Sequence, residues 1–79
     1  MNLQQAKEEQ NIGRLNLRRI RENRNMSQLE LAAAMNVGQS AVSQWETGES
    51  RPTYNNLIKL TRILKCSLAE LVGSEQTSA

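Results

Sequence analysis

Two short helical patterns, separated by only a few residues, occupy positions 27–48 of this 79-residue chain. Ser27 and Glu30 form an S-x-x-E capping box, which predicts that the first helix begins at Ser27. Residues 36–38, Asn-Val-Gly, favour the left-handed conformation that ends a helix and then a tight turn. A second helix follows at once and stops before Gly48. We therefore predict two short helices joined by a tight turn.

The second of these helices, residues 38–47, has two chemically distinct faces. At 100° per residue, its amide and hydroxyl side chains fall within an arc of about 140°; they are Gln39, Ser40, Ser43, Gln44 and Thr47. The opposite side carries Ala41, Val42 and Trp45, with Glu46 at the border. A glutamine amide can donate and accept at once, which suits the edge of adenine in the major groove of DNA, and serine can bond to either kind of base. The uncharged face therefore favours base recognition, and the alternative is a surface helix with unremarkable polar residues.

Further helices are predicted on both sides of this pair. Pro52 blocks continuation of the preceding helix and Thr53 is a suitable N-cap for the next. Ser67 and Glu70 form a second capping box. Helices are expected near 13–24, 27–35, 38–47, 53–65 and 67–73, and no stretch alternates as a strand does. The prediction is an all-α, compact five-helix domain at 13–73, preceded by a flexible polar arm at 1–12 and followed by a polar tail at 74–79.

The predicted core is almost entirely aliphatic, because the chain contains no Phe and a single Trp. Trp45 is expected to pack at its centre, where a flat ring can touch several helices. Stacking of Trp45 on nucleic acid is the alternative, and its place on the apolar face argues against it. The other core positions are Leu17, Ile20, Leu31, Ala32, Met35, Val37, Val42, Leu57, Leu60, Leu64, Leu68 and Leu71.

Residues 14–73 resemble a known family of DNA-binding domains. The blocks that carry the resemblance are RRIREN, SQLELA, VGQSAVSQWETG, RPTYNNLIKLTRIL and CSLAEL, together with the spacing between them. These blocks and spacings are similar to those of the helix-turn-helix domains of the lambdoid phage repressors and Cro proteins. The resemblance implies a lambda-repressor-like fold in which the 38–47 helix enters the major groove. Gln39, Ser40, Ser43 and Gln44 would then lie near base edges.

The resemblance also assigns roles outside the base-reading face. It pairs Arg21 with Glu46, which would fix the first helix relative to the reading helix. It places Gln28 next to a phosphate, where Gln28 would also brace Gln39. The residues implied to hold the DNA backbone are Gln28, Thr47, Arg51 and Thr53, the last at the start of the fourth helix.

Positive charge is concentrated in the first helix, although the net charge of the chain is only +2. Residues 14–24 contain five arginines against the single acid Glu22, whereas residues 25–79 hold four bases and five acids. This basic helix, which includes Arg19, is interpreted as a phosphate-facing surface, and a solvated helix face is the alternative.

Several classes of site are excluded by composition. The absence of His removes the Ser–His and Cys–His nucleophile arrangements and the commonest metal ligand. The single cysteine, Cys66, can form neither an internal disulfide nor a zinc site, and we expect it to be a small buried hydrophobe. No apolar run approaches the roughly 20 residues needed to span a membrane, and residues 1–12 lack the apolar region of a signal peptide. We expect a cytoplasmic protein that is not an enzyme and has no cofactor, metal or small-molecule substrate.

The functional hypothesis is a sequence-specific regulator of transcription that binds double-stranded DNA, acts as a repressor, and reads a palindromic operator as a homodimer. Ile63 and Val72 are the candidates for the dimer contact. Three alternatives remain open. The chain could be the DNA-binding part of a longer repressor, an antitoxin or restriction-modification controller with the same domain, or a protein-interaction module that has kept the fold and lost DNA binding.

Overall fold

The structure, a computed structural model, describes residues 15–73. Within this range the chain forms five helices and no strand, namely α2 (Leu17–Asn23), α3 (Gln28–Met35), α4 (Gln39–Thr47), α5 (Tyr54–Leu64) and α6 (Leu68–Val72). The predicted all-α fold class is confirmed. The predicted arm at 1–12 and tail at 74–79 lie outside the described residues.

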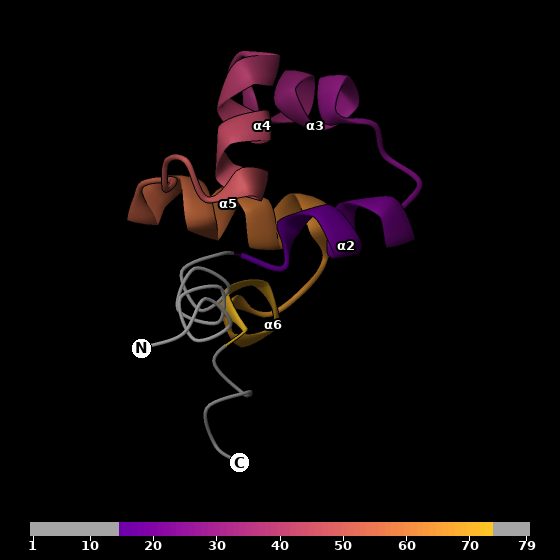
Figure 1. Cartoon of the computed structure of the whole chain (residues 1–79). Coiled ribbons are helices and arrows are strands. Elements are labelled where there is room, and N and C mark those ends of the chain that lie inside the picture. The colour runs from indigo at the N-terminus through magenta and orange to yellow at the C-terminus, as the bar shows by residue number, and fades with distance from the viewer. Residues whose placement is uncertain (1–14, 74–79) are drawn as a thin grey trace, which may run out of the picture.

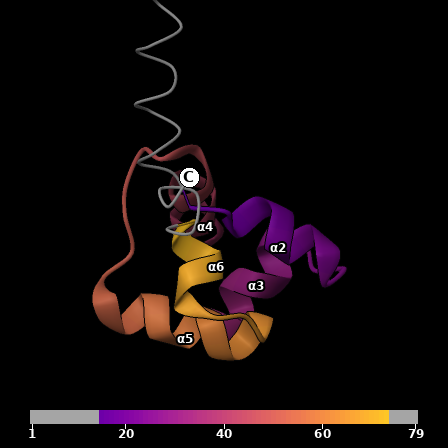
Figure 2. The same cartoon turned by 90° about the horizontal axis from the view of Figure 1, so that it is seen from below.

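The helices pack in pairs around one core. α3 contacts both α4 and α5, α2 contacts α4, and α5 contacts α6. α3 and α4 lie at one end of the described domain and α6 at the other, with α2 and α5 between them (Figure 1). From below, α6 crosses the underside between α2 and α5, and the segment 48–53 runs around the outside from α4 to α5 (Figure 2). α4 is therefore supported on one side by the rest of the fold.

The helix ends are set by the residues that the sequence indicated. Ser27 and Ser67 each accept a hydrogen bond from the backbone N–H of the glutamate three residues on, and each glutamate bonds back to the serine N–H. Thr53 caps α5 by accepting from the N–H of Asn56 at 3.2 Å. Asn36 ends α3 with φ of 61°, a left-handed conformation that asparagine tolerates well. Apart from α2, the predicted ranges differ from the observed helices only by cap residues.

The first described helix begins later than predicted. We expected a helix from about Gly13, whereas residues 15 and 16 are not helical and α2 begins at Leu17. The reason is tertiary, because Asn16 is bound to the end of α6. Its backbone N–H donates to the carbonyl oxygen of Leu71 at 2.8 Å, and its side-chain Nδ2 donates to that of Glu70 at 3.0 Å.

The end of α5 shows a second feature that the sequence did not indicate. Lys65 adopts a left-handed conformation, with φ of 54°, at a position where glycine is commoner. The Arg24 guanidinium donates from Nε to the Leu64 carbonyl at 2.6 Å and from Nη2 to the Lys65 carbonyl at 3.0 Å. Arg24 therefore satisfies carbonyls that the helix end leaves open.

The core is close to the predicted one. Its fully buried aliphatic members include Leu17, Leu31 and Leu60, and Trp45 is only 6% exposed. Val37, Leu57 and Leu68 were predicted in the core but are only half-buried. Val37 lies in the turn after α3 and Leu68 is the first residue of α6, so neither is enclosed on all sides. Cys66 is likewise half-buried against the core rather than fully buried as expected.

Capping gives a direct test of this architecture. Replacing Ser27 with Ala removes the acceptor for the Glu30 N–H, and we expect the free energy of unfolding to fall by about 1 kcal/mol. Ser40→Ala is the matched control, because Ser40 is an exposed helical serine outside any cap, and it should change stability by less than about 0.5 kcal/mol. Urea unfolding measures both changes. Equal losses in the two variants would contradict the capping role.

Candidate nucleic-acid interface

α4 has the two faces that its sequence predicted. Val42, Trp45 and Glu46 are its buried residues. Gln39, Ser40, Gln44 and Thr47 are exposed, and Ser43 is half-buried. Because the ring of Trp45 lies inside the core, it is not available to stack on a ligand. The surface that α4 presents is thus made of amides and hydroxyls without a charge.

A buried ion pair joins α4 to α2. Arg21 donates from Nε to Oε2 of Glu46 at 2.6 Å and from Nη2 to Oε1 at 3.3 Å. The side chains of Arg21 and Glu46 are 10% and 4% exposed. This pairing raises the pKa of the Arg21 guanidinium above its ordinary value, mainly through the hydrogen bond to Glu46. The Arg21 guanidinium therefore stays charged where α2 meets α4.

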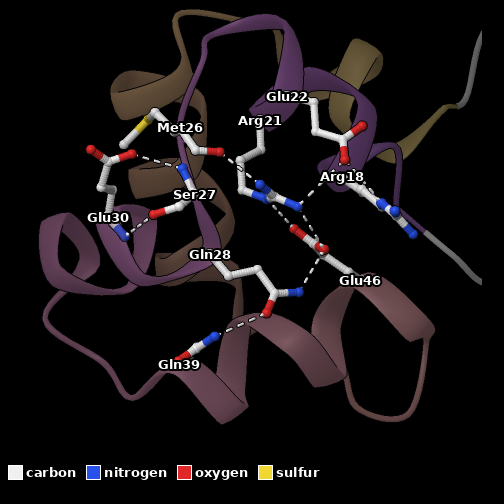
Figure 3. Close-up of polar contacts among 9 residues, drawn as sticks. All are labelled: Arg18, Arg21, Glu22, Met26, Ser27, Gln28, Glu30, Gln39 and Glu46. Atoms are coloured by element: carbon white, nitrogen blue, oxygen red, sulfur yellow. Dashed lines mark hydrogen bonds and ion pairs between the residues drawn. The ribbon is translucent and has the colours of Figure 1, made fainter.

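The same guanidinium also holds the segment that leads into α3. Arg21 donates from Nη1 to the backbone carbonyl of Met26 at 2.6 Å. One side chain thus positions α2, the 24–27 segment and α4 together (Figure 3). Among the residues that the structure describes, no buried side-chain nitrogen or oxygen lacks a hydrogen-bond partner.

Gln28 connects this pair to the exposed face of α4. Its Nε2 donates to Oε1 of Glu46 at 3.0 Å, and its Oε1 accepts from Nε2 of Gln39 at 3.4 Å. The result is a continuous series of hydrogen bonds from Arg21 in α2 to Gln39 at the start of α4 (Figure 3). The contact between Gln28 and Gln39 is the one that the family resemblance implied.

The other end of α4 is organised by contacts that the sequence did not indicate. Ser50 donates from Oγ to Oε1 of Gln44 at 3.4 Å. The Thr47 hydroxyl donates to the Gln44 carbonyl at 3.2 Å and accepts from the Glu49 N–H at 3.4 Å. Ser50 was missed because it lies in a loop, where no helical period predicts its neighbours. Arg51 and Thr53 are exposed in the same segment, and the Thr53 hydroxyl is already engaged in capping α5.

The arginines at residues 14–24, which the charge pattern suggested as a phosphate-facing surface, differ in exposure and in their partners. Arg21 is buried against Glu46 and Arg24 binds the end of α5. Arg18 pairs with Glu22 at 3.2 Å on an exposed surface. Arg19 is exposed, and its charge acts with that of Arg24 to lower the pKa of Glu70, after the larger effect of the Ser67 hydrogen bonds. Arg14 lies outside the described residues.

Cys66 is a poor nucleophile in this environment. Its pKa is raised, first by burial of the thiol and then by the charge of Glu70. A raised pKa keeps the sulfur protonated at neutral pH, and the thiolate is the reactive form. In the range 15–73 no three His, Cys, Asp or Glu residues lie close enough to hold a metal ion. No helix within that range is long and apolar enough to cross a membrane.

A double-mutant cycle tests the pair between α2 and α4. Arg21→Ala or Glu46→Ala alone leaves a buried charge unmatched, and breaking a fully buried pair costs about 3–5 kcal/mol. We expect each single change to lower the free energy of unfolding by up to that amount, and the double change to cost less than the sum of the singles. Denaturant unfolding of the four proteins gives the coupling energy. Strictly additive losses would show that the two side chains do not interact.

Comparison with known proteins agrees with the geometry. The family model described as helix-turn-helix, of the Cro/C1 type, matches residues 17–71. Over 51 residues, 65% of this chain and 38% of the relative, the chain is 43% identical to the HTH-type transcriptional regulator DicA of Escherichia coli (strain K12). Over 60 residues, 76% of this chain and 29% of the relative, it is 28% identical to the HTH-type transcriptional activator BcrR of Enterococcus faecalis. The matched region thus spans less than half the length of either relative. The chain belongs to the Cro/C1-type helix-turn-helix family of transcription regulators.

Proposed function

We propose that this protein is a sequence-specific regulator of transcription that binds double-stranded DNA through α4. The observation that carries the proposal is the exposed, uncharged face of α4, on which Gln39 donates a hydrogen bond to Gln28 and Gln44 accepts one from Ser50. Base recognition requires donors and acceptors in fixed positions, and a rigid support provides them. An α-helix fits the major groove, where each base pair presents a distinct pattern of donors and acceptors.

The side chains of α4 divide into two base-reading groups. Gln39 and Ser40 lie in the first turn of α4, the end that approaches the bases in helix-turn-helix docking. Ser43 and Gln44 lie one turn further along the same face. Because Ser50 binds Oε1 of Gln44, the Nε2 donor of Gln44 remains for an acceptor on a base.

Contacts with the sugar-phosphate backbone would position the helix. Gln28 is the first residue of α3, Thr47 is the last residue of α4, and Arg51 and Thr53 follow in the segment that leads to α5. Arg51 supplies the positive charge among them. Arg19 is the member of this predicted set that lies in α2, where it is exposed. Such contacts fix the register of the protein on DNA without reading sequence.

We propose repression as the mode of action, with a homodimer on a palindromic operator. Repression needs only occupancy of the operator, whereas activation needs an additional contact with the transcription machinery. One module reads only a few base pairs, so two symmetric copies give a site of useful length. Ile63 and Val72 are both half-buried, and either can contribute apolar area to a partner copy.

Loss of the two glutamines should reduce selectivity more than general affinity. We expect Gln39→Ala and Gln44→Ala each to weaken binding to the selected operator by roughly 1–3 kcal/mol and to relax the preference at one position per half-site. Binding to random duplex DNA should barely change, because that interaction is electrostatic and neither residue is charged. Selection of bound duplexes from a random pool, followed by titration, measures both properties. Full affinity and full preference in both variants would favour a protein-interaction module.

Loss of Arg51 should have the opposite pattern. Arg51→Ala is expected to weaken binding to operator and random DNA about equally and to reduce the log–log salt slope by about 0.9 per protomer. Arg62→Ala is the matched control, because it removes the same charge from an exposed position in the last turn of α5. Titrations at several salt concentrations give the slopes. If the Arg51 and Arg62 variants behave alike, the 48–53 segment does not contact phosphates.

A further inference from the structure

The hydrogen bonds between Glu46, Gln28 and Gln39 have a fixed direction. Glu46 is a buried carboxylate paired with Arg21, and an ionised carboxylate can only accept hydrogen bonds. Gln28 must therefore turn its Nε2 donor toward Glu46, which it does at 3.0 Å. A reversed Gln28 amide would bring its own oxygen against the carboxylate.

The same reasoning fixes the orientation of the Gln39 amide. Once Nε2 of Gln28 faces Glu46, its Oε1 faces the other way and can only accept. Gln39 must then present its own Nε2, and the two atoms are 3.4 Å apart. This leaves Gln39 with a free acceptor, Oε1, and one remaining N–H on Nε2. Figure 3 shows the three side chains in this sequence.

A neighbouring acceptor and donor match one base edge in particular. In the major groove, adenine offers the N6 amino group as a donor and N7 as an acceptor, whereas guanine offers two acceptors, O6 and N7. A Gln39 amide held in the observed orientation is complementary to adenine. If residue 28 presented a donor to Gln39 instead of an acceptor, Gln39 would turn its Nε2 group outward. It would then favour a base with two acceptors.

We propose that Glu46 is a positioning residue that determines which base Gln39 selects, by fixing the orientation of both amides through Gln28. This inference rests on the proposed function, since it requires that Gln39 reads a base. Glu46 itself is buried and acts only through the intervening side chain. Beyond its part in the ion pair, the Glu46 carboxylate thereby sets the polarity of a recognition contact on the protein surface.

Exchanging residue 28 tests the proposal without disturbing the core, because Gln28 is only half-buried. In Gln28→Lys, the lysine ammonium offers donors only. It can still pair with Glu46, but it can bond to Gln39 only by donating to Oε1 of Gln39. Gln39 then turns its amino group outward, and the selected base should change from adenine to guanine. Gln28→Met removes both hydrogen bonds, and discrimination between adenine and guanine should fall by about tenfold at that position.

The experiment is selection of bound duplexes from a random pool by the native chain and each variant. The position read by Gln39 is identified as the one whose preference is lost in Gln39→Ala. The preference at the position read by Gln44 is an internal control, because Gln44 lies outside the Glu46–Gln28–Gln39 series. It should remain unchanged in the Gln28 variants.

Two further variants separate positioning from simple stabilisation. Glu46→Gln places an amide that can donate or accept, so the adenine preference should weaken at the Gln39 position alone. Arg21→Ala breaks the same ion pair but leaves an acceptor at residue 46, so stability should fall while the adenine preference persists. Selections are run at a temperature where thermal unfolding shows both variants folded. If Glu46→Gln does not fold, the Gln28 variants decide the question.

The outcomes distinguish the two proposals. A change to guanine in Gln28→Lys supports the positioning role. If Gln39→Ala relaxes one position but Gln28→Lys still selects adenine there, the positioning role is overturned and the proposed function stands. If the native chain selects no common sequence, both are overturned.

Discussion

The Arg21–Glu46 pair is the interaction on which the arrangement of this domain depends. It lies between α2 and α4, is almost completely buried, and also holds the Met26 carbonyl. A buried pair of this kind contributes little net stability compared with apolar packing, but the loss of one partner is costly. It therefore acts mainly as a constraint. α4 packs in its observed position only where the carboxylate meets the guanidinium, and this fixes α4 relative to α2.

Short helices of this length need such constraints, because they gain little stability from their own backbone. Here, hydrogen bonds at the ends of the helices supply many of these constraints. Ser27, Thr53 and Ser67 cap three N-termini, while Arg24 and Asn16 bind carbonyls at the ends of α5 and α6 from elsewhere in the chain. The N-cap and C-cap residues of α2 thus hold the ends of both C-terminal helices. The aliphatic core can then close around Trp45.

The candidate site inherits its rigidity from this scaffold. Gln28 bonds to both Glu46 and Gln39, and so connects the buried carboxylate to the start of α4. Ser50, beyond the other end of α4, donates a hydrogen bond to Gln44. Both amides on the exposed face of α4 therefore have a hydrogen-bond partner within the domain. Such a surface is suited to hydrogen-bond recognition, because little side-chain entropy remains to be lost on binding.

The sequence by itself determined the helices and the two faces of α4. Capping residues, Gly48 and the period of the apolar positions act locally, so they can be interpreted without knowing what lies nearby. The tertiary structure decided what the charged and polar side chains do, because their partners are distant in the chain. Arg21 and Arg24 look alike in sequence, yet one pairs with Glu46 and the other caps α5. The start of α2 at Leu17 likewise depends on distant residues, since Asn16 bonds to carbonyls of α6 that lie more than fifty residues away.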